Sequence, residues 1–188
     1  MKTGAEFAAA ALLKKWNKYK YNQLYCQAFV EEVLKDIGIT KPDGSFYNWK
    51  GSNSMYRNFY QWRGTKEECI NKFGCVPLGA FVYIWRETGA ELVGYYDDLG
   101  NFTHVGIYCG DNIVRDSTRS TKTGRDGVGN TTLDRFTHVS LFTGLDYSDN
   151  KKYNSSETEL QKILSEMNLK LKEWGNKINE IAGSAGTT

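Results

Sequence analysis

The segment FTHVGIYCGDNIVRDS, residues 102–117, predicts a tight β-hairpin. Its two halves, residues 103–108 and 112–117, are short runs rich in β-branched and aromatic residues, and the turn-forming residues 110–112 lie between them. Three other segments have the same composition and are bounded by Gly, Asp or Asn: residues 80–85, 91–96 and 137–142. Together these segments predict a run of antiparallel strands in the second half of the chain.

The first half of the chain has helical patterns instead. Residues 3–19 are dense in alanine, which favours a helix. Residues 21–38 predict an amphipathic helix with Asn22 as its N-cap and Gly38 as its C-terminal stop. Its apolar side chains recur at helical spacing: Cys26, Phe29, Val30, Val33, Leu34 and Ile37.

The connection between these two regions, residues 40–77, is rich in Gly, Asn, Ser and aromatic residues. It predicts a mainly irregular segment with short helices at 53–61 and 66–73. Helices followed by antiparallel strands indicate an α+β domain, with the N-terminal helices packed on a curved antiparallel sheet or small barrel. We place this domain at residues 1–150.

Residues 151–188 form a separate charged segment that ends in the linker-like sequence AGSAGTT. A heptad pattern predicts a helix over residues 156–181, because apolar residues alternate at spacings of four and three: Leu160, Leu164, Met167, Leu171, Trp174, Ile178 and Ile181. So narrow a stripe favours pairing with another helix. The alternative is a helix that packs back on the domain.

Charge and hydropathy exclude several classes of protein. The net charge is +2 and the charged residues are interspersed, so no basic face for nucleic acid is indicated. No apolar run is long enough to span a bilayer. The apolar run 8–13 is shorter than that of a signal peptide, and its lysines follow it. We therefore expect synthesis in a cytoplasm without a signal peptide.

The four cysteines, at positions 26, 69, 75 and 109, include no CxxC pair. This spacing argues against a zinc ribbon and against a disulfide framework. Free thiols are the favoured interpretation. A disulfide between Cys69 and Cys75 in an oxidising setting is the alternative.

Three residues of the predicted elements could form a catalytic group. The hairpin can bring His104 and Asp116 to the same end of paired strands, where the carboxylate would orient the imidazole. The second ring nitrogen would then face Cys26 at the start of its helix. Taken singly, each residue also has a structural interpretation, since a free cysteine on an apolar stripe is commonly buried filler. His138 shares the THV context of His104.

Three motifs in this order resemble the NlpC/P60 cysteine peptidases and their CHAP relatives, which cleave bacterial peptidoglycan: YCQAFVEEVLKDIGI, VPLGAFVYIW and FTHVGIYCGDNIVRDS. The resemblance covers roughly residues 20–145 and implies a papain-like α+β core. Three departures stand out. Ala80 replaces the usual acidic residue after the glycine, Tyr25 precedes the cysteine where many members carry Asp, and Gln27–Ala28 replaces the common Ser-Gly.

The resemblance implies that Cys26 is the nucleophile, His104 the general base and Asp116 the orienting residue. The expected substrate is an amide bond in the stem peptide of peptidoglycan, and the expected mechanism requires no metal and no organic cofactor. The alternatives are a CHAP-type N-acetylmuramoyl-L-alanine amidase, an acyl transferase, and a non-catalytic wall-binding or structural module. Aromatic residues near the nucleophile or in the irregular segment are expected to contact substrate: Tyr25, Trp49, Tyr56 and Trp62.

The segment GVGNTTLDRFTHVSLF, residues 127–142, is similar to the tail of such domains in phage and prophage lysins. It therefore implies an endolysin or a tail-associated lysin that reaches the wall through a holin or as part of a virion. For such a protein we expect the helix 156–181 to project from the domain. It would either self-associate or connect to a further wall-binding module.

Overall fold

The computed structural model describes residues 1–87, 97 and 99–148, together with the helical positions 167, 170, 172 and 174. The chain divides into two compact units, Met1–Asn150 and Lys151–Thr188. In the second unit, Met167 and Trp174 of the expected heptad pattern are helical and exposed. Apart from the four helical positions, the predicted helix 156–181 lies outside the described residues, as does the predicted strand 91–96.

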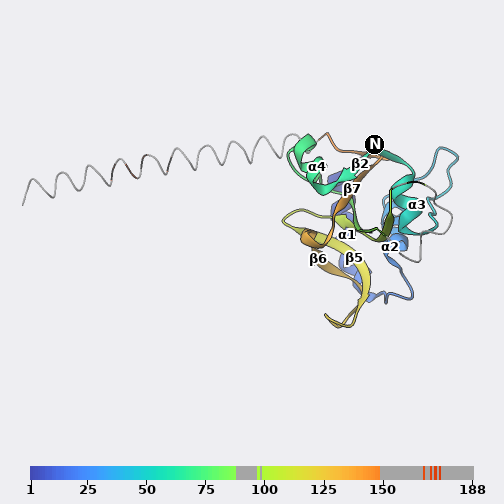
Figure 1. Ribbon diagram of the computed structural model, residues 1–188. Coiled ribbons are helices and arrows are strands. Elements are labelled where there is room, and N and C mark those ends of the chain that lie inside the picture. Colours follow the sequence, from blue (N-terminus) through green and yellow to red (C-terminus); the bar gives the residue numbers. More distant parts are fainter. Residues whose placement is uncertain are drawn as a thin grey trace, which may run out of the picture. The chain divides into compact units, whose positions relative to one another are not determined.

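The first unit is an α+β domain, as the sequence predicts, and its centre is a six-stranded antiparallel sheet (Figure 1). The strands lie in the order β2 (Tyr60–Thr65), β7 (His138–Phe142), β3 (Phe81–Arg86), β4 (Asn101–Tyr108), β5 (Ile113–Ser120) and β6 (Arg125–Thr132). The predicted hairpin is the β4–β5 pair, in which Tyr108 is opposite Val114. Two short strands, β1 (Lys2–Thr3) and β8 (Leu145–Asp146), form a separate parallel pair.

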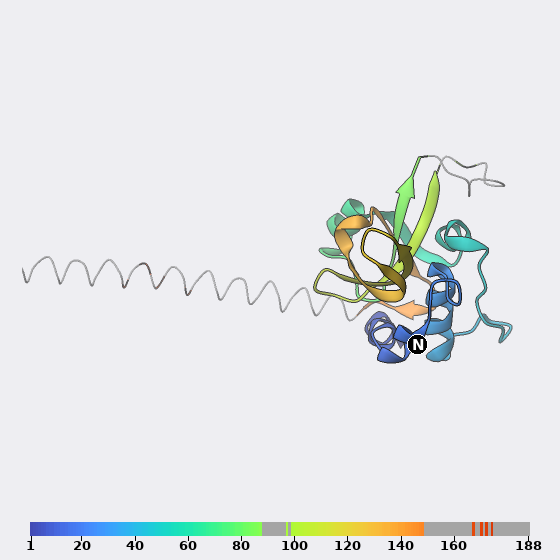
Figure 2. The same cartoon turned by 90° about the horizontal axis from the view of Figure 1, so that it is seen from below.

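The described residues of the first unit form four α-helices and two 3₁₀ helices: α1 (Gly4–Ala11), η1 (Lys14–Lys18), α2 (Cys26–Asp36), α3 (Gly51–Arg57), α4 (Lys66–Phe73) and η3 (Leu133–Arg135). Figure 2 shows α1 and α2, both in blue, side by side at one edge of the domain. A capping box with Thr65 and Glu68 begins α4, within the predicted limits of that helix. In the part of the chain that the structure describes, no helix is long and apolar enough to cross a membrane.

Two apolar clusters stabilise the sheet, and alternate residues of β3 contribute to each. Phe81 and Tyr83 join the larger cluster, which includes the buried side chains of α1, α2 and α3. Val82 between them joins the smaller cluster, with Cys69 of α4. Because successive strand residues point to opposite faces, helices cover both sides of the sheet.

The predicted helix 3–19 is wrong beyond residue 11, where α1 ends and the chain turns into η1. Trp16 is the physical reason. Its indole Nε1 donates to the Ala10 carbonyl at 2.9 Å, and its ring meets Phe29 of α2 edge-on with centroids 5.8 Å apart. If the helix continued through residue 16, the Trp16 indole could not fold back to the Ala10 carbonyl in the last turn of α1.

Two strands of the six-stranded sheet are missing from the sequence prediction, as are the short strands β1 and β8. The predicted helix 53–61 is α3 followed, after Phe59 at φ +61°, by the edge strand β2. The other missed strand of the sheet, β6, is rich in Gly and Asn, residues that are depleted in strands. Its pairing with β5 over the whole length of both strands overrides that local preference.

The segment before α2 is held against β5 and β6 by three hydrogen bonds. The Val128 N–H donates to the Tyr19 carbonyl at 3.4 Å, the Tyr21 N–H to Asp126 Oδ1 at 3.2 Å, and the Ser117 hydroxyl to the Leu24 carbonyl. This tethering explains why Asn22 is not the N-cap. Helical structure begins only at Cys26, with Tyr25 as the N-cap, whereas Gly38 does end the helix at φ +78°.

Gly127 is the residue that allows this close approach. It has φ +120°, and a Cβ there would lie 2.0 Å from the Tyr19 carbonyl oxygen. We expect Gly127→Ala to lower the free energy of unfolding by about 2 kcal/mol or more, through strain and through loss of the contact. Urea denaturation measures this change.

Gly124→Ala is the matched control for Gly127→Ala. Gly124 also has a positive φ, +66°, but a Cβ there would meet nothing within 4 Å. We expect it to cost only about 1 kcal/mol, the penalty of the left-handed conformation. Equal losses for the two variants would show that the Tyr19 contact contributes nothing to stability.

Candidate active site

Cys26 is the first residue of α2, and its side chain is buried. The Phe29 N–H donates to the Tyr25 carbonyl at 2.8 Å, which closes the first turn and leaves the backbone N–H groups of the first three residues without helical partners. Among the described residues, no side chain caps this turn. The sulfur is therefore placed at the positive end of the helix dipole, where a thiolate is favoured.

His104 and Asp116 come together across β4 and β5, as the sequence predicts. The His104 Nε2 lies 2.6 Å from Asp116 Oδ2, with the ring N–H donating to the carboxylate. The Asp116 side chain is completely buried. A completely buried carboxylate at this distance fixes both the tautomer and the orientation of the imidazole.

Cys26 interacts with the same imidazole, and Nδ1 is the ring nitrogen that Asp116 leaves available. Burial by itself disfavours the imidazolium, but the hydrogen bond to Asp116 and the interactions with Cys26 and Asp116 outweigh it and raise the pKa of His104 to about 9. The site therefore favours the protonated form of the His104 imidazole.

Arg125 is a member of this group that the sequence analysis missed. Its Nη2 lies 2.6 Å from Asp116 Oδ1, so the carboxylate is bound by the imidazole on one oxygen and by the guanidinium on the other. Arg125 opens β6, the glycine-rich strand that the sequence does not predict. The neighbouring Gly124 could indicate only a turn, so no local pattern marks Arg125 as part of the site.

A glycine of the HVGIY motif makes room for the carboxylate. A Cβ at Gly106 would lie 2.5 Å from Val114 Cγ1 and 3.1 Å from the Asp116 Cβ. Any larger side chain would push β5 away from β4. Gly106 therefore sets the spacing at which Asp116 reaches His104.

The four aromatic residues expected to contact substrate lie in different environments. Tyr25 is half exposed beside Cys26, and its ring meets that of Tyr21 edge-on at 5.3 Å between centroids. Trp49 and Tyr56 are buried in the larger core cluster, where they pack against other aromatic rings, and their expected contact with substrate stays a prediction. Trp62 is partly buried against Phe73 in the smaller cluster.

The other three cysteines have no imidazole partner among the described residues. All four thiols are free, and the alternative disulfide between Cys69 and Cys75 is not formed. Burial raises the pKa of Cys69 to about 12, and likewise that of Cys109. His138 lies among the rings of Tyr56, Trp85 and Phe102, and burial lowers its pKa.

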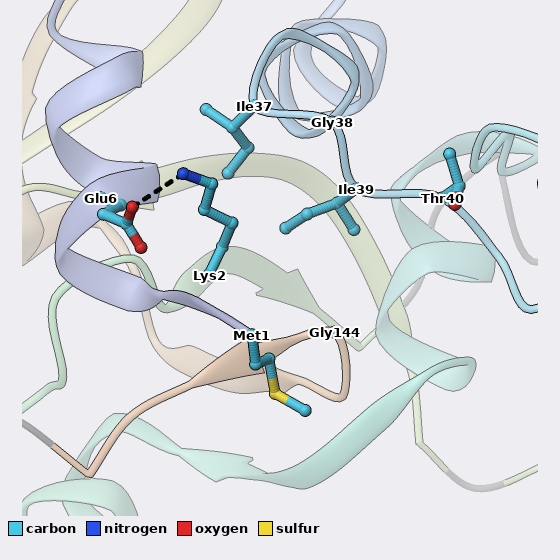
Figure 3. Close-up of a pocket in the computed structure, with 8 residues that line it drawn as sticks. All are labelled: Met1, Lys2, Glu6, Ile37, Gly38, Ile39, Thr40 and Gly144. Atoms are coloured by element: carbon cyan, nitrogen blue, oxygen red, sulfur yellow. Dashed lines mark hydrogen bonds and ion pairs between the residues drawn. The ribbon is translucent and has the colours of Figure 1, made fainter.

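A pocket of about 530 Å³ lies at the opposite end of α2 from Cys26 (Figure 3). Its lining comes from the start of the chain, the residues that follow α2 and the turn before β8: Met1, Lys2, Glu6, Ile37, Gly38, Ile39, Thr40 and Gly144. The Lys2–Glu6 ion pair, at 2.8 Å, crosses one side of it. It contains no residue of the Cys26 group.

Comparison of the chain with known families and proteins adds no assignment: no family model, curated protein or solved structure matches it. The geometry is therefore the basis for a functional argument. The imidazole of His104 lies between a cysteine and a buried carboxylate. Nucleophile, base and orienting group have this arrangement in enzymes that catalyse acyl transfer.

The reactivity of Cys26 can be compared with that of the other thiols. We expect iodoacetamide at about pH 6 to alkylate Cys26 fastest, because the helix N-terminus and the protonated His104 favour its thiolate. Cys69 and Cys109 should remain unmodified, and His104→Ala should remove the advantage of Cys26. Peptide mapping by mass spectrometry measures each site. Equal modification of all four cysteines would contradict the pairing.

The pKa of His104 has a consequence for pH. The imidazolium is present below about pH 9 and is lost as the pH rises through that value. In Asp116→Asn the negative charge is removed while burial remains, so we expect the pKa of His104 to fall by about one unit or more. NMR titration of the ring measures it, and His138 is the internal control. An unchanged His104 midpoint would exclude Asp116 as its partner.

Proposed function

We propose that the chain is a cysteine peptidase of the NlpC/P60 type, with a papain-like core, that hydrolyses an amide bond in the stem peptide of bacterial peptidoglycan. The observation that carries the chemistry is the hydrogen bond between His104 and Asp116, together with the interaction of His104 with Cys26. The substrate class rests on the resemblance of three sequence motifs to that family.

In the proposed reaction, the Cys26 thiolate attacks the carbonyl carbon of the amide. The oxyanion that forms is stabilised by backbone N–H groups of the first turn of α2. Protonated His104 then gives its Nδ1 proton to the leaving amine, and the C–N bond breaks to leave a thioester on Cys26. Neutral His104 next takes a proton from water, which attacks the thioester and releases the carboxylic acid and the thiolate.

Asp116 takes part in this cycle without bonding to the substrate. Its carboxylate accepts the Nε2–H of His104 in every step, which keeps Nδ1 directed at the sulfur and at the leaving amine. The half-exposed Tyr25, next to Cys26, would form one wall of the substrate site. An exposed aromatic ring can pack against sugar or aliphatic peptide surfaces of the wall polymer.

The biological setting we propose is that of a phage or prophage lysin. The segment that resembles lysin tails, residues 127–142, contributes most of β6 and all of η3 and β7. Its β6 part pairs with β5, the strand that carries Asp116. Release through a holin or carriage in a virion would bring the enzyme to the wall.

Turbidity of purified peptidoglycan tests the proposal. We expect the wild-type chain to clear the suspension and Cys26→Ala to lose activity by about a thousandfold or more, because the nucleophile is absent. Cys75→Ala, at a partly buried thiol outside the site, is the matched control and should retain activity.

Analysis of the released fragments assigns the bond. New amino groups on residues beyond the first residue of the stem peptide indicate a peptidase. A new amino group on the first residue, with release of the whole peptide from the lactyl group of the sugar, indicates an amidase. Clearing by Cys26→Ala at the wild-type rate would refute the proposed mechanism. A wild-type chain that leaves peptidoglycan intact, although Cys26 is selectively alkylated, would refute the substrate class alone.

A further inference from the structure

The Asp116 carboxylate has a different partner on each oxygen. His104 Nε2 lies 2.6 Å from Oδ2, and Arg125 Nη2 lies 2.6 Å from Oδ1. The Asp116 side chain is completely buried, and that of Arg125 is mostly buried. Burial of a carboxylate favours its neutral form unless a cation compensates for the lost hydration. Arg125 supplies such a cation on the side away from the imidazole.

The path of the Arg125 side chain depends on a glycine. In the β5–β6 ladder Arg125 is opposite Ser120, whereas Asp116 is opposite Gly129, so the guanidinium must extend along its own strand to reach the carboxylate. A Cβ at Gly129 would lie 2.8 Å from Arg125 Cδ and 3.2 Å from its Nη1. Gly129 therefore leaves the space through which the side chain passes.

A second hydrogen bond holds the guanidinium in this position. Arg125 Nη1 donates to the Asn130 carbonyl at 2.8 Å, while Nη2 donates to Asp116. Because the guanidinium is planar, these two bonds together set the plane of the group relative to the carboxylate. Asp116 is thereby fixed in orientation as well as in charge.

Other charged groups around Asp116 do not duplicate this contact. Arg115, the preceding residue of β5, interacts with Asp116 electrostatically, but its guanidinium donates to Ala11, Asn17 and Asn130 instead. Arg119, also on β5, is exposed and pairs with Asp126 of β6 at 3.5 Å. Of the arginines that the structure describes on β5 and β6, Arg125 is therefore the one in contact with the carboxylate.

We propose that Arg125 is a positioning residue of the active site, which acts through Asp116 to keep the carboxylate ionised and directed at His104. The inference rests on the proposed pairing of Cys26 with His104. Without the guanidinium, protonation of the buried carboxyl competes with its bond to the imidazole. The thiolate–imidazolium pair then loses its support, most strongly at acidic pH.

The rate of Cys26 alkylation by iodoacetamide, measured as a function of pH, tests the role of Arg125 without any wall substrate. At about pH 6 we expect R125M to react about ten- to a hundredfold more slowly than wild type, the equivalent of one charge-assisted hydrogen bond. At alkaline pH, where a thiolate forms without a partner, the two rates should converge. R125K retains the charge and should lose less.

R119Q is the matched control, since it removes an exposed arginine of the same hairpin, and its profile should follow wild type. G129A is the second variant: it keeps Arg125 but fills the space beneath its side chain, and we expect the same acid-specific loss. If R125M does not fold, the pH profile of Cys26 alkylation in G129A tests the inference by itself. Wild-type rates at about pH 6, or a loss that is equal at every pH, would overturn the inference.

Hydrolysis of peptidoglycan is followed in the same variants and separates the two proposals. An acid-specific loss of alkylation in a protein that never clears the wall supports the positioning role and refutes the proposed substrate. If the protein clears the wall and the pH profile of Cys26 alkylation in R125M is identical to that of wild type, the proposed substrate is supported and the positioning role is refuted.

Discussion

Asp116 carries a carboxylate that is completely buried between the imidazole of His104 and the guanidinium of Arg125. A lone buried charge would be expensive, so the neighbouring strands must deliver both partners at hydrogen-bonding distance. Two glycines meet that requirement sterically: Gly106 lets β5 approach β4, and Gly129 lets the arginine side chain pass over β6. The register of three strands, β4, β5 and β6, is thus linked to one side chain.

Strands β5 and β6 also position the nucleophile. Residues 19–25 bond to Ser117, Asp126 and Val128 of β5 and β6, so the N-terminus of α2 is held by the strands that carry the carboxylate and the arginine. Environment then separates the thiols chemically. Cys26 lies at a helix N-terminus beside an imidazole, while burial without such a partner makes the thiols of Cys69 and Cys109 weak acids.

Local sequence patterns determined the parts of the protein that have strong periodicity or chemistry of their own. The apolar spacing of α2 and the β-branched runs of β3, β4, β5 and β7 are local properties, and they predicted the α+β class. Because the turn at residues 110–112 is tight, the pattern also predicted that His104 would meet Asp116. With two histidines in the chain, that contact could be reached from the sequence.

Tertiary structure decided what had no local signal. Strand β6 is poor in β-forming residues and exists because β5 pairs with it along its whole length, so Arg125 could not be assigned to the site from its neighbours in sequence. The break at residue 11 and the late start of α2 follow from Trp16 packing and from bonds to distant strands. The burial of Trp49 and Tyr56 was likewise hidden, because an aromatic residue in an irregular segment looks the same whether it lines a groove or fills a core. Only contacts between residues far apart in the chain distinguish those cases.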